Sequence, residues 1–228
     1  MQAIILAGGA GTRLRRVVSV VPKPLAPIKS RPFLEILFDY LAEQGFSDIL
    51  LTVGYMAQSI VGHFGNKYRG IGIEYLVEDQ PLGTGGAIKH ALNYVSRDPV
   101  FIVNGDTFLR VDYRAVSEEH HTSGAMMTMV LKRVKDTSRY GRVHTKGDRV
   151  LSFQNAEPGN AGTINTGVYL VSKGLFERYS LPSTFSFEQE FLLPHVRDLH
   201  PLAYFTEGYF RDIGVPEDYQ RAQDELGG

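Results

Sequence analysis

Short apolar runs alternate with amphipathic stretches through the first half of the chain. Residues 3–7 (AIILA) and 99–104 (PVFIVN) are almost wholly apolar, which is typical of strands buried on both faces of a parallel sheet. Residues 32–44 carry apolar positions at helical spacing and stop at Gly45. The same alternation predicts strands at 48–55 and 71–77 and helices at 57–64 and 83–94. This order predicts an α/β fold of Rossmann-like type, a mainly parallel sheet flanked by helices.

The second half of the chain has a different pattern. Its alternation predicts strands at 125–134 and 164–171 and a hairpin at 142–153 that turns at 146–148. We therefore expect a small antiparallel excursion from the main sheet. Further elements are a helix at 184–199, which Pro194 ends or kinks, and a last strand at 203–205. We treat residues 1–228 as a single domain.

Composition excludes several classes of protein. The 228 residues are 43% hydrophobic and carry a formal net charge of −1, so neither nucleic acid nor a membrane surface is an expected partner. The absence of cysteine excludes disulfides, Cys-ligated zinc and thiol catalysis. No apolar stretch reaches membrane-spanning length, and the N-terminus lacks a basic-then-apolar signal region. The expected location is the cytoplasm.

A glycine-rich loop follows the first apolar run. Gly8, Gly9 and Gly11 come directly after it, and Arg13 lies just beyond. Glycines at a strand exit let backbone N–H groups approach a bound polyphosphate closely. Lys23 stands between two prolines, which fix the backbone around it. The G-G-x-G spacing fits neither a P-loop nor a dinucleotide fingerprint, so the loop indicates another kind of nucleoside-triphosphate site.

Four stretches together resemble the signature of the sugar-phosphate nucleotidylyltransferases over nearly the whole chain. They are G-G-A-G-T-R-L with P-K-P, P-L-G-T-G-G-A, N-G-D and D-I-G-V-P-E-D-Y. The resemblance implies the nucleotide-diphospho-sugar transferase type of fold, with the nucleotide bound by roughly residues 1–110 and the sugar phosphate by roughly 111–228. It implies transfer of a nucleoside monophosphate to a sugar 1-phosphate, with Mg²⁺ as cofactor. The implied partners are small-molecule substrates, and a homo-oligomer is left open.

The resemblance also implies roles for individual residues. Arg13 would hold the leaving phosphates, and Lys23 would bridge the α-phosphate and the acceptor. Asp106 and Asp212 would share the Mg²⁺ ion, which prefers carboxylates together with phosphate oxygens. The backbone of residues 83–86 would lie against the nucleobase and ribose. The residues expected to bind the nucleotide are Leu6, Ala7, Gly8, Gly9, Gly11, Thr12, Glu78, Pro81, Gly83 and Thr84.

Glu78 stands where relatives place the side chain that recognises the base. An ionised carboxylate only accepts hydrogen bonds, and guanine offers N1–H and its exocyclic amine on one edge. Uracil and thymine offer one donor flanked by two carbonyl groups, which a carboxylate repels. Glu78 therefore favours guanine, and GTP is the expected nucleotide.

Near the other end of the chain, Glu217 and Asp218 follow Pro216 and are expected in the first turn of a closing helix.

The acceptor half departs from the family at one point. The family's usual Phe-x-Glu-Lys stretch reads Phe153-Gln154-Asn155-Ala156 here, so the lysine that grips the sugar phosphate is missing. Either another cation takes its place or acceptor affinity is weak; the candidate cations are Arg139, Arg142, Lys173 and Arg211. The residues expected to bind the acceptor are Asn104, Gly141, Glu157, Asn165 and Thr166. The run at 185–193 (FSFEQEFLL) is expected to pack as amphipathic core.

Within the family, the motifs are most similar to the guanylyltransferases that act on D-glycero-D-manno-heptose 1-phosphate. This implies transfer of GMP from GTP, giving a GDP-heptose and pyrophosphate for surface-glycan assembly. Two alternatives stay in the same class: mannose 1-phosphate with GTP, and N-acetylmuramate 1-phosphate with UTP. A third belongs to another class, a nucleotide-binding module that has lost transfer, which the missing Glu-Lys pair favours and the retained Asp106 and Asp212 oppose.

Overall fold

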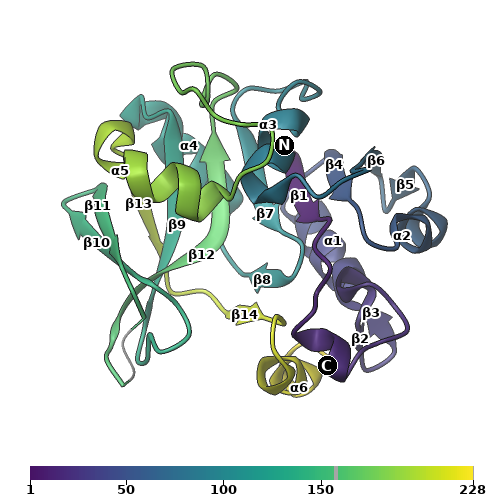
Figure 1. The fold of residues 1–228 in the computed structure, drawn as a ribbon. Helices are drawn as coiled ribbons and strands as arrows, with labels where there is room; N and C mark the ends of the chain where they lie inside the picture. The colour runs from purple at the N-terminus through teal and green to yellow at the C-terminus, as the bar shows by residue number, and fades with distance from the viewer. Residues whose placement is uncertain (157–158, 228) are drawn as a thin grey trace.

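One sheet of ten strands runs through the computed structural model, which describes residues 1–156 and 159–227 (Figure 1). Its first half is parallel, with the strands in the order β7-β1-β4-β6, and the short β5 closes this edge antiparallel to β6. These strands are β1 (Gln2–Ala7), β4 (Asp48–Val53), β5 (Lys67–Tyr68), β6 (Ile71–Val77) and β7 (Val100–Asn104). Because β1 is paired on both sides and covered on both faces, its apolar run is almost fully buried. The predicted parallel core is confirmed.

The second half of the chain extends the same sheet instead of forming a separate one. Strand β12 pairs antiparallel with β7 on one side and with β9 on the other, and β13 then runs parallel to β9. The hairpin β10–β11 forms the far edge, as its turn signal predicts. The bounds are β9 (Met127–Val134), β10 (Arg142–Lys146), β11 (Arg149–Gln154), β12 (Gly162–Val171) and β13 (Leu202–Thr206). The antiparallel excursion is therefore part of one continuous mixed sheet.

Helices cover both faces of the sheet and bury two hydrophobic clusters. One cluster receives side chains from α1 (Phe33–Glu43), α2 (Ala57–Phe64), α4 (Tyr113–Ser123) and α6 (Pro216–Glu225). The other receives them from α3 (Gly83–Ala91), the π-helical segment η3 (Phe187–Leu192) and α5 (Leu193–Leu199). Two 3₁₀ turns and a small ribbon follow the glycine loop: η1 (Leu14–Arg16), η2 (Lys23–Leu25), β2 (Pro27–Ile28) and β3 (Arg31–Pro32). None of the described helices combines the length and apolarity that a bilayer crossing requires.

Two helical regions differ from the prediction. Helix α4 is not predicted by the hydrophobic pattern, because only Tyr113, Val116 and His120 of its eleven residues are buried. Its start depends on a capping interaction, in which the Asp112 carboxylate accepts hydrogen bonds from two backbone N–H groups of the first turn. The helix predicted over residues 184–199 is divided into η3 and α5. Pro194 lies in the first turn of α5, where its missing N–H costs no hydrogen bond.

A second, two-stranded sheet joins distant parts of the sequence. Strand β8 (Thr107–Leu109) follows β7 after a turn and pairs antiparallel with β14 (Phe210–Asp212), which comes about a hundred residues later. In this register Asp212 lies opposite Thr107, and the N–H of Ile213 donates to the carbonyl of Asp106 at 3.0 Å. The pairing, which the sequence pattern does not predict, brings Asp106 and Asp212 side by side.

Two glycines of the P-L-G-T-G-G-A stretch serve packing between α3 and residues 183–187. A Cβ atom on Gly85 would lie 2.2 Å from the ring of Phe185, and one on Gly86 would lie 2.3 Å from the carbonyl oxygen of Ser183. The N–H of Gly85 donates to the Phe185 carbonyl at 2.9 Å. Both glycines are buried. Gly85 and Gly86 are therefore required for packing against residues 183–187, a role that the prediction for residues 83–86 does not include.

Gly85→Ala should destabilise the protein by about 1–3 kcal/mol, because the added methyl group overpacks the contact with the Phe185 ring. Gly62→Ala is the matched control, since Gly62 lies inside α2 with no atom within 4 Å of the added Cβ. This control should stabilise the protein by about 0.5–1 kcal/mol through helix propensity. Urea unfolding of both variants gives the measurement, and equal effects in the two would contradict the packing role of Gly85.

Candidate active site

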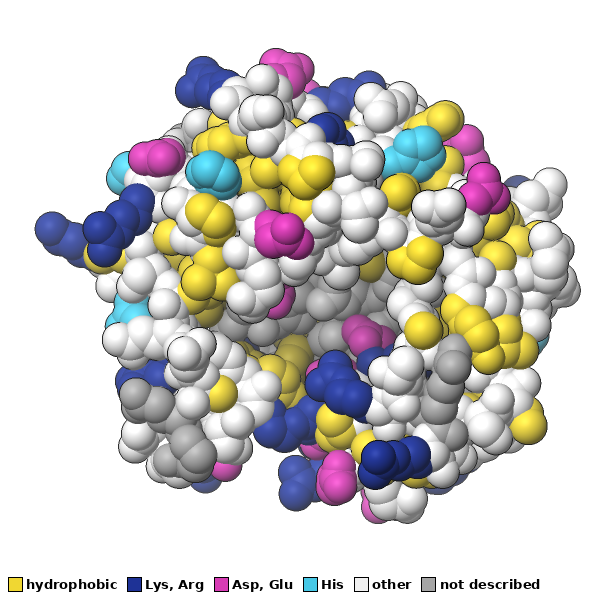
Figure 2. Space-filling view, in the orientation of Figure 1, with side chains coloured by type: hydrophobic (Ala, Val, Ile, Leu, Met, Phe, Trp, Pro, Cys, Tyr) yellow, Lys and Arg dark blue, Asp and Glu magenta, His cyan; other side chains and the backbone are white. Residues whose placement is uncertain are grey.

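Two adjoining cavities open at the carboxyl ends of the parallel strands. The large cavity, of about 610 Å³, lies beyond β1, β4, β6 and β7, and the small cavity, of about 240 Å³, lies beside the glycine loop. Leu6, Gly9 and Asp106 line both, so the two cavities lie side by side. Figure 2 shows this face hollowed at its centre, with charged side chains beside the hollow. Open α/β sheets bind their ligands at this edge.

The large cavity brings together most of the residues predicted to contact the base and ribose. The predicted residues that line it are Leu6, Gly8, Gly9, Glu78, Pro81, Gly83, Thr84, Asn104 and Asp106. Sequence reasoning missed Thr52, Gly54, Tyr55 and Asp79, which also line it. The sequence could have predicted Gly54 and Tyr55, because they directly follow a buried parallel strand whose carboxyl end lies at the same edge of the sheet.

Glu78 is held at one wall of the large cavity. Its Oε2 atom accepts a hydrogen bond from the N–H of Leu82 at 3.1 Å, and its Oε1 atom lies 3.2 Å from where a Cβ atom on Gly8 would be. A larger residue at position 8 would press against the carboxylate, so the glycine makes room for it. Burial raises the pKa of Glu78, and the Leu82 hydrogen bond partly opposes this shift.

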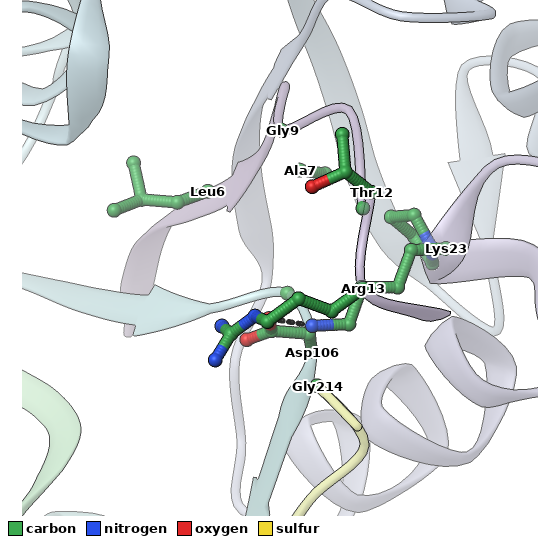
Figure 3. Close-up of a pocket in the computed structure, with 11 residues that line it drawn as sticks. Leu6, Ala7, Gly9, Thr12, Arg13, Lys23, Asp106 and Gly214 are labelled. Carbon is green, nitrogen blue, oxygen red and sulfur yellow. Dashed lines mark hydrogen bonds and ion pairs between the residues drawn. The ribbon is translucent and has the colours of Figure 1, made fainter. Parts of the chain in front are cut away.

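The small cavity contains the predicted phosphate-binding residues Ala7, Gly11, Thr12, Arg13 and Lys23. Lys23 begins η2, whose next two residues are buried, so its backbone is anchored. Gly11 has φ of +58°, and a Cβ atom there would lie 2.9 Å from the Cβ atom of Lys23. A glycine is required for this close approach. In Figure 3 the side chains of Arg13 and Lys23 both extend toward Asp106.

The Lys23 ammonium group forms an ion pair with Asp106 and lies close to Asp212. A Cβ atom on Gly214 would lie 3.2 Å from the Lys23 nitrogen and 2.8 Å from Oδ1 of Asp212, so Gly214 leaves the space in which these groups meet. Burial and the charge of Asp106 raise the pKa of Asp212, while Lys23 lowers it. Burial is the largest cause of this shift, and repulsion between the two carboxylates adds to it.

This arrangement fits a divalent cation that takes some of its ligands from phosphate. Among the described residues, no group of three or more His, Cys, Asp or Glu side chains could hold a metal ion by itself. Mg²⁺ takes one or two carboxylates together with phosphate oxygens and water, so two adjacent aspartates beside a phosphate-sized cavity satisfy its preference. A cation there would also relieve the repulsion that raises the pKa of Asp212.

Only one of the four candidate cations for the acceptor phosphate lies within 4 Å of Asp212. The Arg139 guanidinium lies 3.8 Å from Oδ2 of Asp212 and forms an ion pair with Asp218. Arg211 is bound to Asp218 and Glu225 instead. The other two lie elsewhere. The Arg142 side chain packs where a Cβ atom on Gly162 would be. Lys173 follows β12, and its backbone N–H donates to Asp98 at the amino-terminal end of β7, away from the cavities.

A third cavity, of about 230 Å³, lies in the second half of the chain. Its lining residues are Gly141, Phe153, Gln154, Asn155, Ala156, Asn165, Glu188, Gln189 and Leu193. Gly141 and Asn165 were predicted at the acceptor site. Glu188 and Gln189 were missed, because the run at 185–193 was interpreted as core packing. That interpretation is correct for Phe187 and Phe191, which are buried, but the residues between them face outward.

The remaining acceptor residues have different positions. Thr166 is buried, and its hydroxyl donates to the carbonyl of Val130 at 2.7 Å, so its contact is structural and it lines none of the three cavities. Asn104 lines the large cavity, and its side chain occupies the space beside Gly167, where φ is +74° and no side chain fits. Glu157 lies outside the described residues.

The chain belongs to the nucleotidyl transferase family, which it matches over residues 2–227. It is 46% identical over 226 residues to D-glycero-alpha-D-manno-heptose 1-phosphate guanylyltransferase of Aneurinibacillus thermoaerophilus, covering 99% of this chain and 98% of that one. It is 32% identical to mannose-1-phosphate guanylyltransferase of Mycobacterium tuberculosis, covering 99% of this chain and 64% of that protein. Among solved structures, HddC from Yersinia pseudotuberculosis complexed with GMP-PN matches with a TM-score of 0.87 and 36% identity over 99% of both chains. The predicted family and fold class are confirmed.

Proposed function

We propose that this protein transfers GMP from GTP to D-glycero-D-manno-heptose 1-phosphate and releases pyrophosphate. The observation that carries the proposal is the adjacency of the large and small cavities, with Glu78 in the large cavity and the Lys23–Asp106–Asp212 cluster beside the small one. The name of the 46% identical relative supports this acceptor over mannose 1-phosphate, whose named enzyme is 32% identical and extends well beyond this chain.

The base follows from the chemistry of Glu78. Its carboxylate offers two acceptor oxygens to the large cavity, and guanine presents two adjacent donors on one edge. The bond from Leu82 and the packing against Gly8 fix the carboxylate before a ligand binds. Leu6, Pro81, Gly83 and Thr84 would contact the base and ribose around it. The HddC complex with GMP-PN supports a guanine nucleotide.

Arg13 and Lys23 would bring two anions together. An oxygen of the sugar 1-phosphate attacks the α-phosphorus of GTP in line, the bond from the α-phosphorus to the bridging oxygen breaks, and pyrophosphate leaves with that electron pair. The attacking oxygen is already an anion, so no strong general base is required. Catalysis then consists of positioning and charge neutralisation. Arg13 would hold the leaving phosphates, with the N–H groups of the glycine loop, and Lys23 would lie between the α-phosphate and the acceptor.

Asp106 and Asp212 would hold Mg²⁺ between them, as their adjacent carboxylates suit this ion. When bound, the ion supplies positive charge that neutralises the phosphate oxygens during transfer. The aspartates must be ionised to do so, and Lys23 lowers the pKa of Asp212 and so favours its ionised form. Because the two aspartates come from the two halves of the chain, we infer that residues 1–228 act as a single domain.

Arg139 would take the place of the lysine that the chain lacks at Ala156. Its guanidinium lies 3.8 Å from Asp212, next to the position where the acceptor phosphate must meet the α-phosphate. Tyr140 follows it and packs against Phe210, with the two ring centroids 5.6 Å apart, and Gly141 lines the third cavity. Residues 139–141 therefore connect the cluster to the third cavity, where the sugar ring would lie.

The test is pyrophosphate release with Mg²⁺, with GTP, UTP, ATP and dTTP each paired with heptose, mannose and N-acetylmuramate 1-phosphates. The proposal predicts the highest kcat/KM for GTP with heptose 1-phosphate. The Asp106→Ala protein serves as the blank and should release none above background. A preference for mannose 1-phosphate or for UTP would establish one of the two alternatives in the same class. Nucleotide binding without release in any pair would establish the non-catalytic module.

Glu78→Gln should raise the KM for GTP by about 10- to 100-fold, because one of the two acceptors for guanine becomes a donor. The amide can pair with uracil, so the selectivity for GTP over UTP should fall. In the wild type, KM for GTP should rise as pH falls through the raised pKa of Glu78, and this dependence should vanish in the variant. Glu74→Gln, at an exposed position of β6, the strand that leads to Glu78, is the control. Unchanged selectivity would show that Glu78 does not recognise the base.

A further inference from the structure

Glu188 is the one charged side chain among the described residues that line the third cavity. We propose that its carboxylate binds two neighbouring hydroxyl groups of the acceptor sugar, and that Asn165 and Tyr169 hold it in position. The inference rests on the proposed function, since the sugar of a sugar 1-phosphate is the ligand. It assigns to η3 a specificity role that the sequence pattern of this segment does not suggest.

Asn165 lines the third cavity, but both hydrogens of its amide nitrogen already have partners inside the protein. Its amide nitrogen donates to Oε1 of Glu188 at 2.7 Å and to the hydroxyl of Tyr169 at 2.6 Å. Its carbonyl oxygen accepts from the N–H of Gly167 at 3.2 Å. An amide group has two N–H hydrogens, and both are used here. Asn165 is thus a positioning residue, and the polar group it positions is Glu188.

Tyr169 provides the second bond to the same carboxylate oxygen. Its hydroxyl donates to Oε1 of Glu188 at 3.0 Å. Its ring is buried and packs edge to face against Phe187, with the ring centroids 5.2 Å apart. Burial raises the pKa of Tyr169 well above its ordinary value, so the hydroxyl stays a donor at working pH. With two donors on Oε1, the Oε2 atom of Glu188 has no hydrogen bond from any described residue and stays available to a ligand.

The segment that carries Glu188 is fixed at its start by three hydrogen bonds. At its start, the N–H of Gln189 donates to the Ser186 hydroxyl, and the N–H of Ser186 donates to the carboxylate of Glu190. The N–H of Phe187 donates to the Thr84 hydroxyl at 2.9 Å. Since Thr84 lines the large cavity, Glu188 has a fixed position relative to the nucleotide.

The chemistry of the third cavity matches a polyhydroxylated ring and not a phosphate. Its lining holds no Lys or Arg among the described residues, so a phosphate would meet no opposite charge. A carboxylate accepts hydrogen bonds only, and the two lone pairs of Oε2 can accept two of them, which neighbouring hydroxyl groups of a sugar would donate. A hydrogen bond from a hydroxyl group to an ionised carboxylate is stronger than one between two neutral groups. The apolar carbons of a sugar ring would face Phe153 and Leu193.

The test is the KM for the sugar 1-phosphate, measured for Glu188→Gln in the pyrophosphate assay. We expect a rise of at least 10-fold for the sugar phosphate, with the KM for GTP unchanged within twofold. Tyr169→Phe, which removes one positioning bond, should raise the same KM by a smaller factor. Glu190→Gln lies on the same turn and keeps an acceptor for Ser186, so it should behave as wild type.

Analogues that lack one ring hydroxyl make the test specific. In the wild type, removal of a hydroxyl bound by Glu188 should lower kcat/KM by at least 10-fold. In Glu188→Gln, the complete substrate and the analogue should have nearly the same kcat/KM. An equal penalty in both proteins, or an unchanged KM in the variant, overturns the inference. If the wild type releases no pyrophosphate with any pair, the proposed function fails. Calorimetric titration with the same sugar phosphates then decides the role of Glu188, since equal affinities in wild type and variant overturn it.

Discussion

The candidate active site depends on two carboxylates that are held next to each other against their mutual repulsion. Pairing of β8 with β14 brings Asp106 and Asp212 together, and the backbone bond from Ile213 to Asp106 fixes their register. Burial and the neighbouring charge of Asp106 raise the pKa of Asp212, and Lys23 opposes this shift. A folded chain that keeps such a costly arrangement has a ready place for a cation, and the glycine loop beside it has a place for the phosphates that accompany the cation.

The charges continue from this cluster to the closing helix. Arg139 lies between Asp212 and Asp218, and Arg211 bonds to Asp218 and Glu225. Asp218 lies in the first turn of α6 as predicted, and it is also buried and forms ion pairs with three arginines, Arg139, Arg211 and Arg221. These ion pairs connect α6 with the loop that leads to the third cavity. They give the C-terminal helix a direct part in positioning the groups around Asp212.

Local patterns predicted most of the fold, and interactions between distant segments account for what they missed. The bounds of α2 and β6 agree with the prediction because each has a clear period and a glycine after it or before it. The β8–β14 pairing joins short segments about a hundred residues apart, and no local pattern specifies it. The family resemblance places Gly85 and Gly86 against the nucleotide, and no local pattern specifies that they also pack against residues 183–187. Glu188 was missed because flanking phenylalanines made its segment look like core, although the π-helical turn directs it outward.

The central claim, that Asp106 and Asp212 together hold the metal ion, is tested most directly by Mn²⁺ binding. Titration followed by electron paramagnetic resonance, in the presence of a non-hydrolysable GTP analogue, would compare wild type with Asp106→Asn and Asp212→Asn. Asp224→Asn, an exposed position on α6, is the control for a lost charge. The account predicts at least about 10-fold weaker Mn²⁺ binding in both site variants, with melting temperatures no lower than wild type. Unchanged Mn²⁺ affinity in either site variant would contradict it.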